Sequence, residues 1–280
     1  MKWVFFGTDE FAAVVLRELH AKNIIPSLVI CAPDIPLRRN KGFESPATKK
    51  WAHHYNIPVI QPVTLNKEFE LILQKKIWDF FVVASYGKII SQQILDIPRK
   101  GTLNVHPSLL PQYRGASPIE TAIIDDSKQT GVTIMEMDAK MDHGPIISYV
   151  EHTFDEWPSA AEIRRTLATI GGSELANTIP HWMNNTLTSK EQNHSEATFT
   201  KKFLKSDAQV NLEDNDYDNF RKFQAFRDWN DIYFFIKKND TQMRVVIKNA
   251  HFSNNAFIID KVVPEGRKEM SYQQFLSFIE

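Results

Sequence analysis

The sequence contains a single cysteine, Cys31, which excludes a disulfide within the chain and fits a reducing compartment. No stretch approaches the roughly 20 apolar residues that a membrane-spanning helix needs. The first ten residues also reach acidic side chains too soon for a signal peptide. We therefore expect a cytoplasmic protein that does not enter a membrane.

The sequence also lacks an excess of positive or negative charge. The chain has 33 Lys plus Arg against 34 Asp plus Glu, so the charges nearly cancel. A polycation that binds nucleic acid without specificity is therefore excluded, although a local basic patch remains allowed.

Motifs for common cofactors are missing as well. The loop 7–11 (GTDEF) follows the first apolar run but lacks the three glycines of a dinucleotide-binding fingerprint, so nicotinamide binding is not expected. The histidines show no metal-ligand spacing, and we expect no metal. Cys31 is interpreted as a small core residue, because nothing near it in sequence would activate a thiol.

What the sequence does contain is an alternation of apolar strands and amphipathic helices, which predicts an open, mostly parallel α/β sheet of the Rossmann type. The expected strands are 3–6, 28–32, 59–60, 79–85, 101–106, 131–137 and 146–152. The expected helices are 9–21, 45–55, 67–75, 116–124 and 159–183, the last interrupted at Gly171 and Gly172.

The composition changes near residue 184. The segment 184–197 is polar and without periodicity, which predicts a linker between a first domain at 1–183 and a second at 198–280. Beyond it, short apolar runs at 232–236, 244–247 and 256–262 and a helical pattern near 217–226 indicate a smaller, β-rich domain.

Polar side chains follow two of the expected strands. Asn104 and His106 are two residues apart at the end of one strand, so their side chains leave the same face, and Asp142 follows another strand. Ligands bind at the carboxyl ends of strands in such sheets, and an amide, an imidazole and a carboxylate together suit an oxyanion and a proton transfer. The alternative is that all three only satisfy backbone groups near turns.

The residues after the apolar strand 79–85 belong to the same edge of the sheet. Val83, Ala84, Tyr86 and Gly87 are therefore expected near the same pocket. Tyr86 is equally consistent with a plain packing role.

The segment 104–115 (NVHPSLLPQYRG) resembles the signature of folate-dependent formyltransferases. The segments 131–135 (GVTIM) and 141–144 (MDHG) are similar to the second block of that family, and 4–8 (VFFGT) and 57–62 (IPVIQP) resemble its tRNA branch. The resemblance runs through about residue 180 and is weaker beyond.

The resemblance implies transfer of the formyl group of 10-formyltetrahydrofolate to a primary amine, with Asn104, His106 and Asp142 as the catalytic residues. A metal is not required, because the formyl carbon is already electrophilic. The loop after His106 is implied to shape the pterin pocket, with ordinary loop packing as the alternative role. Its cofactor-binding residues would be Ser108, Leu109, Leu110 and Pro111.

The acceptor implied by the tRNA branch is the α-amino group of methionine on initiator tRNA. Arg38, Arg39 and Lys41 would grip tRNA phosphates, unless they form only a solvated basic loop. The family's second domain is an oligonucleotide-binding-type barrel, so 198–280 is expected to be a reduced, tRNA-binding version of it, in a monomeric protein.

Two other activities share these residues. A related branch formylates an amino sugar attached to a nucleotide, and the nearly neutral second domain suits that branch. Alternatively, a hydrolase would give the formyl group to water, or a folate-binding module would have no turnover.

Overall fold

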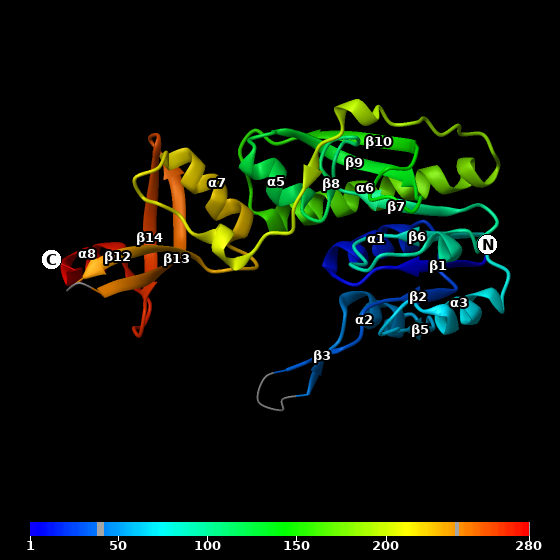
Figure 1. Cartoon of the computed structure of the whole chain (residues 1–280), viewed down its shortest axis with the longest axis horizontal. Coiled ribbons are helices and arrows are strands. Elements are labelled where there is room, and N and C mark those ends of the chain that lie inside the picture. The colour runs from blue at the N-terminus through cyan, green and yellow to red at the C-terminus, as the bar shows by residue number, and fades with distance from the viewer. Residues whose placement is uncertain (38–41, 239–240, 280) are drawn as a thin grey trace. The chain divides into compact units, whose positions relative to one another are not determined.

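The computed structural model describes residues 1–37, 42–238 and 241–279, and the chain divides into two compact units that are described separately (Figure 1). Unit 1 comprises 1–116, 130–152 and 164–199, and unit 2 comprises 117–129, 153–163 and 200–280. Segments 117–129 and 153–163 thus group with the C-terminal part of the chain. The boundaries expected at 183 and 198 remain a prediction about functional domains.

Unit 1 is built on a seven-stranded sheet with the order β10-β9-β7-β6-β1-β2-β5. Its central strands are parallel, and β7 pairs antiparallel with β9, which confirms the expected open, mostly parallel α/β sheet. The strands are β1 (Trp3–Phe6), β2 (Leu28–Ile30), β5 (Val59–Ile60), β6 (Phe80–Val83), β7 (Thr102–His106), β9 (Gln129–Glu136) and β10 (Ile146–Thr153).

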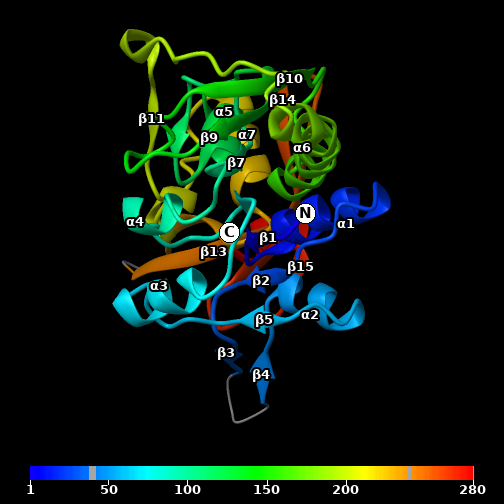
Figure 2. The ribbon, with the colours of Figure 1, turned by 90° about the vertical axis from the view of Figure 1, so that its right-hand side faces the viewer.

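Helices cover both faces of this sheet. Figure 2 shows α1, α2 and α6 on one side and α3 and α4 on the other. The core beneath α3 and α4 is formed by large apolar side chains from strands, such as Phe6 and Phe81, and from the helices, such as Leu73. These helices are α1 (Glu10–Ala21), α2 (Ala47–His54), α3 (Lys67–Gln74), α4 (Gln92–Leu95) and α6 (Ala160–Met183).

Helix starts follow the sequence in part. Asp9 caps α1, since its carboxylate accepts a hydrogen bond from the Ala12 N–H at 3.2 Å. The helix expected from residue 45 instead begins at Ala47, and Pro46 occupies the cap position without a side-chain hydrogen bond.

The α6 helix is continuous, so the interruption expected at Gly171 and Gly172 is wrong. A Cβ on Gly171 would lie 2.7 Å from Val105 and 2.8 Å from Val132, and one on Gly172 would lie 2.7 Å from the Glu18 Cβ. The two glycines therefore let α6 approach the sheet and α1 closely, and this packing outweighs their low helix propensity.

Unit 2 contains an antiparallel sheet with the order β12-β13-β14-β15, and this confirms the β-rich second part. Its elements are α5 (Pro118–Ile124), α7 (Asp216–Phe226), β12 (Ile232–Lys238), β13 (Thr241–Ser253), β14 (Ala256–Pro264), β15 (Met270–Ser271) and α8 (Tyr272–Ile279). The periodicity analysis missed α8, which buries Phe275 against Phe234. Within the described ranges, no helix is long and apolar enough to cross a membrane.

Replacing Gly171 by leucine should lower the free energy of unfolding by roughly 3 kcal/mol, because Val105 and Val132 are buried and cannot yield to a new side chain. Chemical denaturation of the purified protein measures the change. Asn177→Leu, at an exposed position of the same helix, is the control and should change stability by less than about 0.5 kcal/mol. Equal stability of the two variants would contradict the close packing of α6.

Candidate active site

The carboxyl end of β7 carries two buried polar side chains. Asn104 is 8% exposed and His106 is 4% exposed, and they project from the same face of the strand. Asn104 is fixed in register between Val83 of β6 and Met135 of β9. Its side-chain amide has no hydrogen-bond partner among the residues that the structure describes, so it is available to a ligand.

Each nitrogen of the His106 ring faces an oxygen atom. Its Nε2 lies 3.0 Å from the backbone oxygen of Tyr113, and its Nδ1 lies 3.7 Å from Oδ1 of Asp142. A carbonyl oxygen only accepts hydrogen bonds, so Nε2 carries a proton in this arrangement. The orientation leaves Nδ1 facing the carboxylate of Asp142.

Asp142 lies in the tight loop between β9 and β10. Its φ of +48° is in the left-handed region that few side chains adopt. Its Oδ2 accepts a hydrogen bond from the Gly115 N–H at 2.7 Å. A Cβ on Gly144 would lie 2.0 Å from the Glu136 carbonyl oxygen, so this position requires glycine. The structure thus brings Asp142 and His106 together from segments that are distant in sequence.

The loop after His106 is fixed by Thr133, whose position opposite His106 in β9 is set by the strand register. The Thr133 hydroxyl donates to the Ser108 carbonyl at 2.7 Å and accepts from the Leu110 N–H at 3.1 Å. Ser108 Oγ in turn donates to the Gln112 carbonyl at 2.7 Å. Ser108 therefore orders this loop through backbone contacts.

Leu109, Leu110 and Pro111 line a cavity of about 410 Å³. The opposite wall comes from β10 and from the segment after α6. Its other lining residues are Ile146, Tyr149, Glu151, Lys190, Glu191, Gln192, Asn193 and Glu196. This hollow is large enough for part of a small molecule.

The residues expected after β6 divide into two kinds. Val83 and Ala84 are buried, and Gly87 adopts a φ of +74°, which suits glycine. The Tyr86 ring packs edge-on against Phe6 within the core, which matches its packing role. Its buried hydroxyl has no hydrogen-bond partner among the described residues, and burial raises the pKa of Tyr86 above its usual range.

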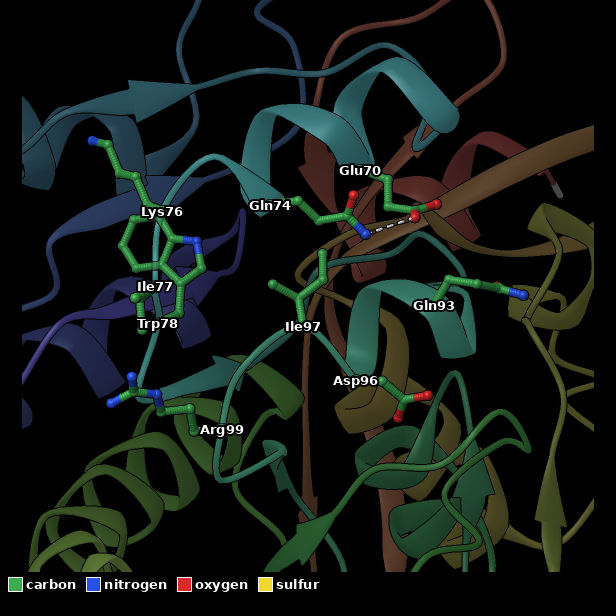
Figure 3. Close-up of a pocket in the computed structure, with 9 residues that line it drawn as sticks. All are labelled: Glu70, Gln74, Lys76, Ile77, Trp78, Gln93, Asp96, Ile97 and Arg99. Carbon is green, nitrogen blue, oxygen red and sulfur yellow. Dashed lines mark hydrogen bonds between the residues drawn. The ribbon is translucent and has the colours of Figure 1, made fainter.

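Another hollow, of about 560 Å³, lies away from these residues (Figure 3). Ile77 and Trp78 line it and precede β6, so it lies at the amino end of that strand. In the same wall Gln74 donates to Glu70 at 3.0 Å. None of the expected site residues that the structure describes lines it, and ligands of such sheets bind at the opposite edge.

Three further expectations concern other parts of the chain. Arg38, Arg39 and Lys41 lie outside the described residues. Cys31 is buried as expected, and burial raises the pKa of its thiol. In the described part of the chain, no group of three or more His, Cys, Asp or Glu residues is arranged to hold a metal ion.

Several groups that hold His106, Asp142 and their loops could not be read from the sequence pattern. These are the Tyr113 carbonyl, the Gly115 N–H, Thr133 and Gln192. Two are backbone groups, which carry no signal in a sequence. Thr133 could have been found from the strand pairing, because it lies directly opposite His106.

Residues 1–179 match the family model described as formyl transferase. The chain is 37% identical over 235 residues to a methionyl-tRNA formyltransferase of Janthinobacterium sp. (strain Marseille), covering 81% of this chain and 74% of the relative. It is 31% identical to the methionyl-tRNA formyltransferase of Thermodesulfovibrio yellowstonii, covering 98% of this chain and 94% of the relative.

The chain belongs to the formyl transferase family. This membership confirms the expectation, drawn from segments 104–115 and 131–144, of an enzyme of formyl transfer. Because the match to the relatives extends well past residue 179, both units of the chain take part in it.

Solved structures of formyltransferases share the fold. A methionyl-tRNA formyltransferase from Clostridium thermocellum has a TM-score of 0.62 at 13% identity, covering 94% of this chain and 98% of that one. A 4-N formyltransferase from Francisella tularensis has a TM-score of 0.66 at 19% identity, covering 86% and 95%. At these identities the likeness establishes the architecture alone.

Replacing Thr133 by valine should lower the free energy of unfolding by about 2 kcal/mol, because the Ser108 carbonyl and the Leu110 N–H would both lose a buried partner. Thr133→Ser keeps the hydroxyl and should cost less than Thr133→Val. Thermal and denaturant unfolding of the two variants provide the measurement. A valine variant as stable as the serine variant would show that Thr133 does not hold the loop.

Proposed function

We propose that this formyl transferase moves the formyl group of 10-formyltetrahydrofolate to the α-amino group of methionyl initiator tRNA in the cytoplasm. The observation that carries the proposal is the approach of the His106 ring to Asp142, 3.7 Å apart, beside the buried amide of Asn104. Relatives covering most of the chain bear the name of this activity.

The reaction begins when the neutral amine attacks the formyl carbon and the carbonyl electron pair moves onto oxygen. Asn104 donates a hydrogen bond to that oxygen. The His106 imidazolium adds positive charge nearby rather than a direct bond, because its Nε2 is occupied by Tyr113. Such stabilisation is strong where water is excluded, and the low exposure of both side chains supports this.

Asp142 accepts the proton of the amine and later returns it. Its Oδ2 is held by Gly115, which leaves Oδ1 toward His106 and the reaction centre. The carboxylate takes the proton that the amine loses, directly or through water. The electron pair on the oxygen then re-forms the carbonyl as the carbon–nitrogen bond to the folate breaks, and the same proton goes to the leaving nitrogen, so that charge and atoms balance.

The folate co-substrate is assigned to the loop after His106 and the turn after β6. Leu109, Leu110 and Pro111 form apolar walls suited to a pterin ring, and Ser108 orders their loop. Val83, Ala84, Tyr86 and Gly87 complete this assignment at the neighbouring strand end. The formyl carbon is electrophilic, so the proposal includes no metal.

The tRNA contacts are assigned to two places. Arg38, Arg39 and Lys41 supply phosphate contacts. In residues 198–280, Tyr233 and Phe235 of β12 lie opposite Val246 and Arg244 on one sheet face, and the Arg244 guanidinium lies 4.0 Å from the Tyr233 ring centroid. Phe235 is exposed and Tyr233 is half-buried, and aromatic rings beside arginine suit stacking with unpaired bases. The protein is proposed to act as a monomer.

Asn104→Ala and His106→Ala should each lower kcat by about 10²–10³-fold, since each removes one stabilising group from the oxyanion. Steady-state kinetics with 10-formyltetrahydrofolate and methionyl-tRNA measure this. His53→Ala, on an exposed position of α2, is the control and should keep full activity. A near-normal rate in either site variant would remove that residue from the mechanism.

The acceptor is tested by offering 10-formyltetrahydrofolate with methionyl initiator tRNA, with a nucleotide-linked amino sugar, or alone. We expect formyl-methionyl-tRNA to form at least 10²-fold faster than either other product, because good acceptor binding is realised in the transition state. Folate absorbance and product mass distinguish the arms. Formylated sugar as the main product would indicate the amino-sugar branch, and formate without an acceptor would indicate a hydrolase.

A further inference from the structure

Gln192 makes four hydrogen bonds around the loop that carries Asp142. Its Nε2 donates to the backbone oxygens of Asp142 at 2.9 Å and Gly144 at 2.7 Å. Its Oε1 accepts from Nε and Nη2 of Arg114 at 3.2 and 2.7 Å. Carbonyls only accept and guanidinium only donates, so the orientation of this amide is fixed by its partners.

Arg114 is buried, at 3% exposure, without a carboxylate partner among the described residues. Besides Gln192, its Nη2 donates to Nδ1 of His194 at 2.9 Å, which fixes that ring with its proton on Nε2. Partial burial, followed by the nearby charges of His143 and Arg114, holds the pKa of His194 below its usual range. A buried arginine without a carboxylate partner needs hydrogen bonds to neutral groups, here Gln192 and His194, to offset the cost of burying its charge.

Residues 114 and 115 therefore hold Asp142 from two directions. The Gly115 N–H bonds the carboxylate itself, and the Arg114 side chain reaches the backbone of the same loop through Gln192. The two residues form the short strand β8 (Arg114–Gly115), which pairs with β11 (Phe199–Thr200). His143, the neighbour of Asp142, stacks on His194 with ring centroids 4.1 Å apart.

We propose that Gln192, which also lines the 410 Å³ cavity, forms with Arg114 a clamp that positions Asp142 for proton transfer. This inference rests on the proposed function, because it gives Asp142 its role. Asp142 also adopts a left-handed φ of +48°, a less common conformation that contacts with the surrounding chain help to hold. A shift of about 1 Å in a reacting group can cost about 10²-fold in rate.

Gln192→Glu separates the two sides of the clamp. One carboxylate oxygen keeps the contact with Arg114, now between opposite charges. The other replaces the NH2 group and faces the carbonyl oxygens of Asp142 and Gly144, which repel it. The side chain keeps its size, so the loop is released without a cavity.

The matched control is Gln93→Glu, the same chemical change at an exposed position (Figure 3). For Gln192→Glu we expect kcat to fall about 10²-fold with little change in KM for either substrate. Hydrogen exchange at the Gly115 amide should accelerate, because its acceptor moves away. Gln93→Glu should match the unmodified protein in every measurement.

Each outcome decides the inference. Normal kcat and normal Gly115 exchange in Gln192→Glu would overturn it, and so would a raised KM at unchanged kcat, which indicates a substrate contact. If Gln192→Glu does not fold, Gln192→Asn, whose side chain is one methylene too short to bridge, should show the same fall in kcat and the same faster Gly115 exchange. Failure of both variants to fold would indicate a purely structural role and overturn the clamp. If Gly115 exchange accelerates in a protein that does not formylate methionyl-tRNA, the proposed function fails and the clamp remains.

Discussion

The register between β7 and β9 is the constraint on which the site depends. It sets His106 of β7 opposite Thr133 of β9, so the strand paired with the one that carries the imidazole supplies the hydroxyl that orders the next loop. The chain then turns back, and the Glu136 N–H donates to the Pro145 carbonyl at 2.9 Å to close the loop holding Asp142. A shift of one residue would turn every side chain of the strand to the other face.

Burial gives this arrangement its chemical strength. Asn104 and His106 are almost inaccessible to water, so hydrogen bonds and charges there are less screened than at a surface. The same burial makes it costly to leave a polar group without a hydrogen-bond partner. The Tyr113 carbonyl therefore pairs with His106, and the Gly115 N–H pairs with Asp142. The groups that hold His106 and Asp142 are thus largely main-chain atoms whose positions follow from the fold.

Local patterns predicted the sheet, most helices and the three polar residues, because period, caps and strand ends are properties of neighbouring residues. The continuity of α6 was not predictable, since it depends on Val105, Val132 and α1, which pack against its glycines. Gln192 escaped notice for a similar reason: it lies 50 residues from Asp142 in a segment without periodicity. The inward direction of Tyr86 is likewise a tertiary property.

The short strand pairing at β8 and β11 has a consequence for dividing the chain. The Thr198 carbonyl accepts from the Arg114 N–H at 2.9 Å, and Gln192 lies on the same stretch of chain. A fragment that ends at Met183, the last residue of α6, would keep every strand of the seven-stranded sheet. It would lack Gln192 and the strand that pairs with β8. A piece that keeps this pairing consequently extends past residue 179, where the family match ends, through residue 200.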